Sequence, residues 1–498
     1  MALIDDIAGD FRWPRDVAWH GQPPLPLAAA MAHAGVPAVS VAVITGGEVS
    51  ETAAWGVACA GESPAATAGT LFQAASISKP VAAACALRLV ADGAFGLDEP
   101  VDERLRTWQV PANGTWRPRL TVRQLLSHTA GLTASAFPGY PPGAAIPSLT
   151  DVLAGRGNTL PVRVSSLPGA QFSYSGGGYC VLQQLLTDVT GLPFPELATE
   201  LVLGPAGMLD SAYAQPLPAG RQGIAAAGHR NGPAPVAGRW HVYPEMAAAG
   251  LWSTPADLAR FAIAIQRSLA AGASDGAGPS AGAGGGSDAG GALLPAELAA
   301  LMIEPAAPNV RCGLGLFSEG SGGSLRFGHT GGNEGFTCEM AGYAGAGIGA
   351  VVMTNADAGL PLVKGVLAAI ARAGDWPGYP EGTARPPTAG TAADPAGAAV
   401  AAGLDESRAG IALAGDYELG ETLIRVREQD GLLTLQAGQQ PPVELVPSGA
   451  GRWAALELNL EVRLGDGGTG ESRPELVLRQ DAPFTTEARA MRRAGQAG

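Results

Sequence analysis

Two stretches of the 498-residue chain contain almost no large apolar residues, and they constrain how the chain can fold. Residues 270–291 are nearly all Gly, Ala, Ser and Asp, and residues 374–402 are rich in Pro, Gly, Ala and Thr. Such segments cannot bury enough apolar surface to order themselves. We therefore expect a first domain at 1–375, with a flexible insertion at 270–291. A linker at 376–407 and a C-terminal domain at 408–498 follow.

The first domain shows strand patterns at both ends and helical patterns between them. Strands are predicted over 41–45, 48–55, 325–327 and 348–353, and helices over 79–91, 122–127, 179–189, 256–268, 295–302 and 362–373. This order predicts an α+β fold in which one sheet, assembled from distant parts of the chain, packs against helices.

The last ninety or so residues change to a period of two. Leucine and valine alternate with charged or polar residues over 456–464, as in a half-buried strand. The segments 424–427 and 433–436 flank Asp430-Gly431, which favours a hairpin. A small antiparallel β-domain is expected here, and no chemical motif lies in it.

The charge balance limits the partners of the chain. A formal net charge of −14 argues against binding to nucleic acid or to an anionic membrane surface, since both need a basic footprint. The five cysteines have no spacing that suggests a metal site or a redox pair, and we expect Cys85 and Cys180 to be small buried side chains. No metal and no organic cofactor is expected. Without a signal-peptide or membrane-span pattern, a cytoplasmic protein is expected.

Ser76-Ile-Ser-Lys79 stands before an alanine-rich helical run. Residues three apart on a helix share a face, and a lysine beside a serine can accept its proton if it is desolvated. The same tetrapeptide is also common at ordinary solvated helix starts.

Two further motifs carry possible chemistry. Tyr174 precedes a triple glycine and a helix, and a phenol can act as a general acid or base. His329-Thr330-Gly331-Gly332 follows a strand pattern; small residues there let a substrate backbone approach, and N–H groups can face an oxyanion. His329 could hold a substrate carboxylate or tune the site. Taken singly, Tyr174 also reads as a core tyrosine and His329 as a turn histidine.

In combination, the three motifs resemble those of the serine β-lactamase-like family. Ser76-x-x-Lys79, Tyr174-Ser-Gly and His329-Thr-Gly occur in the order of that family, which includes class C β-lactamases, DD-peptidases, D-aminopeptidases, esterases and acyltransferases. Phrases such as Leu125-Leu-Ser-His-Thr-Ala-Gly-Leu132 agree, and the similarity covers roughly residues 20–375. The resemblance implies an antiparallel sheet flanked by helices with a helical subdomain.

The resemblance also implies roles for single residues. Ser76 would be the acylated nucleophile, Lys79 its partner and Tyr174 the proton shuttle. The N–H groups of Ser76 and Gly332 would form the oxyanion hole, and His329 would replace the lysine usual in β-lactamases. Thr330 and Gly331 would line the substrate-binding site next to Gly332.

One departure from the β-lactamase pattern shapes the expected function. Gly176 stands where the family often has an asparagine that holds the acyl amide. We therefore expect a serine hydrolase that cleaves an ester, an amide or a D-amino-acid peptide bond in a small molecule or short peptide. An acyltransferase of a biosynthetic pathway, a weak β-lactamase and a penicillin-binding sensor stay as alternatives.

Overall fold

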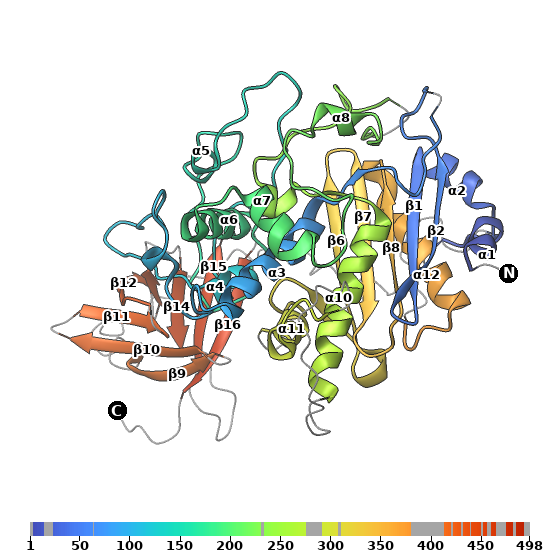
Figure 1. The fold of residues 1–498 in the computed structure, drawn as a ribbon. Coiled ribbons are helices and arrows are strands. Elements are labelled where there is room, and N and C mark those ends of the chain that lie inside the picture. Colours follow the sequence, from blue (N-terminus) through green and yellow to red (C-terminus); the bar gives the residue numbers. More distant parts are fainter. Residues whose placement is uncertain are drawn as a thin grey trace.

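A computed structural model gives the fold of the chain (Figure 1). It describes residues 3–13, 23–62, 64–230, 234–274, 291–306, 310–379, 413–419, 422–429, 432–438, 440–449, 452–455, 460–464, 475–481 and 485–492. An antiparallel sheet with helices on both faces, a helical subdomain beside it and a C-terminal barrel make up these residues. The predicted fold class is confirmed.

The sheet joins the two ends of the first part of the chain. Its strands are β1 (Ala38–Thr45), β2 (Glu48–Gly56), β5 (Phe317–Glu319), β6 (Arg326–Asn333), β7 (Phe336–Tyr343) and β8 (Gly349–Thr354), in the order β2-β1-β8-β7-β6-β5. The apolar run of β1 is buried on both of its faces because helices cover both sides of the sheet. All four predicted strands are present, and β6 is longer than expected.

Helices cover the sheet and form the subdomain. They are α1 (Leu3–Gly9), α2 (Leu27–Ala34), α3 (Ser78–Ala91), α4 (Val122–Leu126), α5 (Leu149–Leu153), α6 (Gly176–Thr190), α7 (Phe194–Ala198), α8 (Ala219–Gln222), α9 (Met246–Ala249), α10 (Pro255–Ser274), α11 (Ala296–Ile303) and α12 (Leu360–Ala373). Single turns occur at η1 (Ala75–Ile77), η2 (Val101–Glu103), η3 (Thr199–Leu203), η4 (Gly322–Ser324) and η5 (Asp357–Gly359), and β3 (Phe72–Gln73) pairs with β4 (Trp252–Ser253). Helix α10 packs on one face of the sheet and α12 on the other.

Two expectations about the apolar-poor segments need correction. Helix α10 continues to Ser274, so the expected flexible insertion at 270–291 starts too early; the alanines of 270–274 are good helix formers. Residues 275–290 lie outside the described residues. The expected linker at 376–407 begins with Trp376, whose ring packs on Tyr343 of the sheet. Residues 380–412 lie outside the described residues.

The C-terminal part is a closed antiparallel barrel. Its strands are β9 (Gly415–Leu419), β10 (Thr422–Gln429), β11 (Leu432–Ala437), β12 (Val443–Gly449), β13 (Arg452–Ala455), β14 (Leu460–Leu464), β15 (Glu475–Asp481) and β16 (Thr485–Arg492), and β9 closes the ring between β16 and β10. The predicted hairpin is confirmed by the pairing of β10 with β11. Of the predicted strand at 456–464, β14 is present and 456–459 lie outside the described residues. The ring closes through two residue pairs, Met491 with Glu418 and Arg492 with Tyr417.

The barrel is attached to the helical subdomain by specific hydrogen bonds. Trp116 Nε1 donates to the carbonyl of Pro441 (3.0 Å), and the N–H of Arg119 donates to Gln440 Oε1 (2.8 Å). Gln440 Nε2 donates back to the carbonyl of Arg119. Trp116 and Gln440 are both buried. This contact fixes the barrel on the loop before α4.

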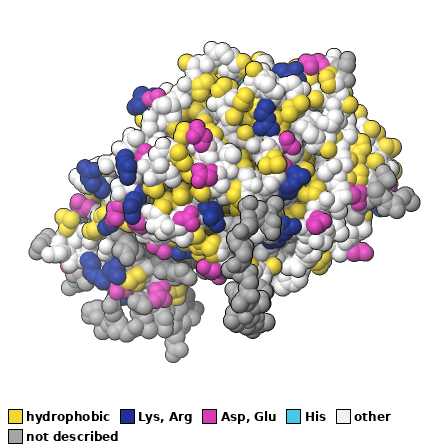
Figure 2. Space-filling view, in the orientation of Figure 1, with side chains coloured by type: hydrophobic (Ala, Val, Ile, Leu, Met, Phe, Trp, Pro, Cys, Tyr) yellow, Lys and Arg dark blue, Asp and Glu magenta, His cyan; other side chains and the backbone are white. Residues whose placement is uncertain are grey.

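The helices and one face of the surface are relevant to two patterns, that of a bilayer-spanning segment and that of a charge patch of one sign. None of the helices there is both long and apolar enough to cross a bilayer. On the face seen in Figure 2, basic and acidic side chains are interspersed rather than gathered by sign.

Candidate active site

Ser76 lies where η1 meets α3, in a turn held by hydrogen bonds. Ser78 Oγ donates to the carbonyl of Ala75 (2.5 Å) and accepts from the N–H of Leu251 (2.9 Å). Ala75 has a φ of 49°, in the left-handed region that alanine rarely adopts. Such strain persists only where the surrounding structure imposes it, and it is common at functional sites. Ser76 itself is half-buried.

Lys79 brings an amine to this hydroxyl. Its Nζ lies 3.0 Å from Ser76 Oγ and donates a second hydrogen bond to the carbonyl of Ala248 (2.8 Å). The lysine is 2% exposed. Because the two bonds hold it between α3 and α9, the amine has one orientation toward the serine. A lysine so placed can exchange a proton with the hydroxyl.

His128 holds Tyr174 over Lys79, and no local sequence pattern indicates this contact. The Tyr174 ring centre lies 4.9 Å from Lys79 Nζ, and its ring stacks on that of His128 at 4.3 Å. His128 Nδ1 also accepts the N–H of Ser175 (3.1 Å), 47 residues along the chain. His128 lies in the segment 125–132, whose sequence contributes to the family resemblance. Its contact with Tyr174 joins distant parts of the chain and therefore could not be predicted from that segment.

His329 faces the same site from β6. Its ring centre lies 6.2 Å from that of Tyr174 and 5.3 Å from that of Phe317, and its Nδ1 donates to the carbonyl of Thr330. Burial, and then the charge of Lys79, lower the pKa of His329 to about 3. The imidazole is therefore neutral near pH 7. It therefore offers no positive charge to a substrate carboxylate.

The glycines of β6 allow the strand to lie against the nucleophile turn. A Cβ on Gly331 would be 2.4 Å from the carbonyl oxygen of Ala74 and 2.5 Å from Cys338 Sγ, whereas one on Gly332 would meet nothing within 4 Å. Strand β5 pairs only with residues 326–328 of β6. At Thr330 and Gly332, which are exposed, the outer edge of β6 has no partner strand in the part of the chain that is described.

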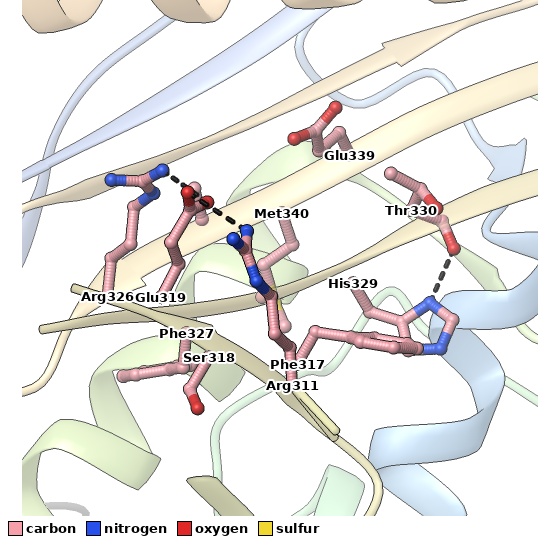
Figure 3. Close-up of a pocket in the computed structure, with 12 residues that line it drawn as sticks. Arg311, Phe317, Ser318, Glu319, Arg326, Phe327, His329, Thr330, Glu339 and Met340 are labelled. Carbon is pink, nitrogen blue, oxygen red and sulfur yellow. Dashed lines mark hydrogen bonds and ion pairs between the residues drawn. The ribbon is translucent and has the colours of Figure 1, made fainter. Parts of the chain in front are cut away.

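A pocket of about 320 Å³ opens beside β5 and residues 326–330 of β6 (Figure 3). Its lining comes from Arg311 and from β5, β6 and β7: Phe317, Ser318, Glu319, Arg326, Phe327, Gly328, His329, Thr330, Glu339, Met340 and Ala341. Phe317, His329 and Thr330 form one end of it, and Glu319 pairs with two arginines at the other. Among the described residues, no cluster of His, Cys, Asp and Glu could hold a metal ion.

The neutral histidines make the stability of the protein depend on pH. Burial and Lys79 also lower the pKa of His128 well below its ordinary value of 6.5. Below pH 6.5 these two histidines therefore bind more protons in the unfolded chain than in the folded one. The contribution of His329 to the free energy of unfolding should fall as the pH falls from 6.5 toward 3, by up to about 1.4 kcal/mol per pH unit, and His128 should act in the same direction.

Urea unfolding of the His329→Gln variant measures this contribution. The slope of stability against pH between 4.5 and 6.5 should be shallower than in the unsubstituted protein. Burial raises the pKa of Glu245 to about 7, so its contribution to the free energy of unfolding falls as the pH rises. This contribution is the same in both proteins and therefore cancels in the comparison. Equal slopes in the two proteins would contradict a neutral, buried His329.

The Ser76 hydroxyl and the Lys79 amine thus lie in contact in a turn that packs against β6. The model of the beta-lactamase family matches residues 27–375, and the chain belongs to that family. The resemblance predicted from the three motifs is thereby confirmed.

The curated relatives match only part of this chain. Esterase EstB of Burkholderia gladioli is 32% identical over 151 residues, which are 29% of this chain and 38% of the esterase. Protein Rv1367c of Mycobacterium tuberculosis is 31% identical over 231 residues, which are 42% of this chain and 56% of that protein. The chain thus matches about a third to a half of the length of these relatives.

Solved structures agree over more of the chain. The crystal structure of SurE aligns with a TM-score of 0.55 at 21% identity, covering 94% of this chain and 97% of SurE. The D-amino acid amidase from Ochrobactrum anthropi SV3 with D-phenylalanine aligns with a TM-score of 0.54 at 21% identity, covering 75% and 99% of the two chains. At these identities the likeness shows the fold.

Proposed function

We propose that the protein is a serine hydrolase that cleaves an ester or amide bond through an acyl-enzyme on Ser76. The observation that carries the proposal is the 3.0 Å contact between Lys79 Nζ and Ser76 Oγ in a chain of the beta-lactamase family. A family of serine hydrolases that includes an esterase and amidase and peptidase structures supports the general chemistry.

In the proposed reaction, Ser76 Oγ attacks the substrate carbonyl carbon as its proton passes to Lys79 or Tyr174. The C–O bond to the serine forms, the bond to the leaving alcohol or amine breaks, and the leaving group takes up the proton. Water then attacks the acyl carbon as its proton passes to the same groups; the bond to Ser76 Oγ breaks, Oγ takes up the proton, and the acid is released. The position of Tyr174 above the Lys79 amine supports its part in this transfer.

We assign the developing oxyanion to the N–H groups of Ser76 and Gly332. The open space above Gly332 and the unpaired outer edge of β6 support this assignment, because a carbonyl group and an extended acyl chain could approach there. Thr330 and Gly331 would border the same acyl chain.

Gly176, at the position where the family often has an asparagine, supports a preference for substrates other than β-lactams. A Cβ on Gly176 would lie 2.7 Å from the Phe137 ring, so Phe137 fills the space that an asparagine side chain needs. An acyl amide would then meet a ring instead of a polar group. Complexes of fold neighbours with D-Leu and D-phenylalanine make D-configured aminoacyl esters and amides the first substrates to test.

Labelling with a fluorophosphonate followed by peptide mapping tests the proposal. We expect one phosphonyl group per chain, on the peptide that contains Ser76. The labelled enzyme should lose its hydrolysis of p-nitrophenyl esters and D-aminoacyl amides in parallel. A label on another residue, or full activity after labelling, would refute the assignment.

The same substrate panel separates the alternatives. Adding an amine or alcohol acceptor would divert the acyl group if the protein is an acyltransferase. A chromogenic cephalosporin that acylates Ser76 and is released slowly, with no turnover of esters, would indicate a penicillin-binding sensor.

A further inference from the structure

Strand β5 occupies part of the strand edge on which the proposed substrate would lie. Its residues pair with residues 326–328 of β6, and Phe317 stands opposite Gly328. From residue 329 onward, this edge of β6 has no partner strand in the described part of the chain. An extended substrate that follows the edge from Gly332 toward residue 329 would therefore meet β5 end-on.

The chain just before β5 connects this edge to the helix that carries the site lysine. Gly315 lies on α3, because a Cβ there would be 2.6 Å from the Cβ of Ala83 and 3.4 Å from the Cα of Pro80. Its φ of 101° is a conformation that favours glycine, and the next residue, Leu316, is fully buried. Residues 315–317 thus run from α3 to β6 across the line of the strand edge.

The side chains at this crossing form an aromatic wall, made by Phe317 and Phe172. The ring centre of Phe317 lies 6.1 Å from that of Phe172 and 5.3 Å from that of His329. His329 in turn lies 6.2 Å from the ring centre of Tyr174. Both phenylalanines are half-buried, so part of the wall is open to a substrate.

The aromatic wall leaves only a short length of strand edge next to the nucleophile. A Cβ on Gly331 would lie 3.2 Å from the Cβ of Ala75, which precedes the nucleophile, so residue 331 is level with it. A strand rises by about 3.4 Å per residue, which places Gly328 and its partner Phe317 about 10 Å farther along. An extended chain spans about 3.3–3.6 Å per residue, so about two residues fit before the ring of Phe317.

The charged side chains near this end favour an uncharged group. Glu319 binds Arg326 (2.5 Å) and Arg311 (3.1 Å) at the end of the pocket away from the nucleophile (Figure 3). Glu339 of β7 stands opposite Thr330 in the strand register and lines the same pocket. A substrate carboxylate beside Thr330 would face a like charge there.

We propose that Phe317 is a specificity-determining residue that limits one half of the substrate to a short, uncharged group of about two residues. That half lies along β6 from Gly331 toward the aromatic wall. It is either the acyl group or the leaving group, and two series of substrates distinguish them. The inference rests on the proposed function, because it concerns the substrate of Ser76.

The two series lengthen D-phenylalanine amide by one to four glycine residues. One series adds them to the leaving amine and keeps a terminal amide, and the other adds them to the amino end. We expect kcat/KM in one of the series to fall by about tenfold or more between two and four glycines, as in sites that reject a group by size.

Three outcomes are distinct. A fall in one series supports the proposal and shows which half of the substrate lies toward β5. Hydrolysis at similar rates along both series would overturn the proposal and leave the proposed function intact. Failure to hydrolyse any member, with p-nitrophenyl acetate also left intact, would refute the proposed function and this inference with it.

Two substitutions of Phe317 should move the limit in opposite directions. In Phe317→Ala the wall is lowered, so the ratio of kcat/KM for four glycines to that for one glycine should rise about tenfold, mainly through KM. In Phe317→Trp the wall is larger, and the same ratio should fall below that of the unsubstituted protein. A general loss of stability cannot raise the ratio in one variant and lower it in the other. An unchanged ratio in both would overturn the role of Phe317.

Ser318→Ala is the matched control on the same strand. Ser318 follows Phe317, so its side chain points to the opposite face of the strand. Its N–H donates to the carbonyl of Arg311 (2.8 Å), and alanine keeps this bond. The variant should have the same ratio as the unsubstituted protein. A rise as large as that in Phe317→Ala would show that the ring does not set the limit and would overturn the proposal.

Discussion

Replacing Ser76 by alanine is expected to lower the hydrolysis of p-nitrophenyl esters by at least about 10³-fold and to abolish labelling by fluorophosphonates. The alanine removes the only atom that could form the acyl bond in the proposed reaction. Lys79 keeps its hydrogen bond to the carbonyl of Ala248, so the site should otherwise stay in place. Stopped assays and intact-protein mass spectra measure the two effects.

Ser78→Ala is the control for this prediction. Ser78 lies one helical residue before Lys79, and its hydroxyl bonds the carbonyl of Ala75 and the N–H of Leu251. Losing these bonds should cost about 1–3 kcal/mol of stability, yet the variant should still take up label at Ser76. Label on the Ser76→Ala protein would show that another nucleophile reacts.

The parts of the site that the sequence predicts are those that depend on local geometry. Ser76 and Lys79 are three residues apart on one turn, so their meeting follows from the period of a helix. The order of the three motifs added Tyr174 and His329 through the family resemblance. The hairpin of β10 and β11 and the long helices were predicted for the same local reason.

The parts that the sequence does not predict depend on packing between distant segments. The stacking of His128 on Tyr174 joins positions 46 residues apart, and nothing near either residue indicates it. The neutral state of His329 and the raised pKa of Glu245 follow from burial, which only the assembled fold defines. The short helices α1 and α2 lack enough turns for a clear period.

Gly331→Ala is expected to have the second large effect, through shape rather than chemistry. The added Cβ would lie 2.4 Å from the carbonyl oxygen of Ala74 and 2.5 Å from Cys338 Sγ, distances that no stable packing allows. Because β6 is bound to β7 on its inner side, the turn that carries Ser76 must give way. We expect a loss of about 1–3 kcal/mol in stability and a fall in labelling rate of about 10²-fold, since a displacement of 1 Å can cost that much.

The neighbouring glycine provides the control for this steric argument. A Cβ on Gly332 would meet no atom within 4 Å, so Gly332→Ala should unfold at the same urea concentration as the unsubstituted protein. The conformational cost of ordering alanine is also no larger than that of glycine in a strand. If Gly331→Ala were as stable as Gly332→Ala, with Ser76 still labelled at the full rate, β6 could not lie as close to the nucleophile turn as the packing at Ala74 requires.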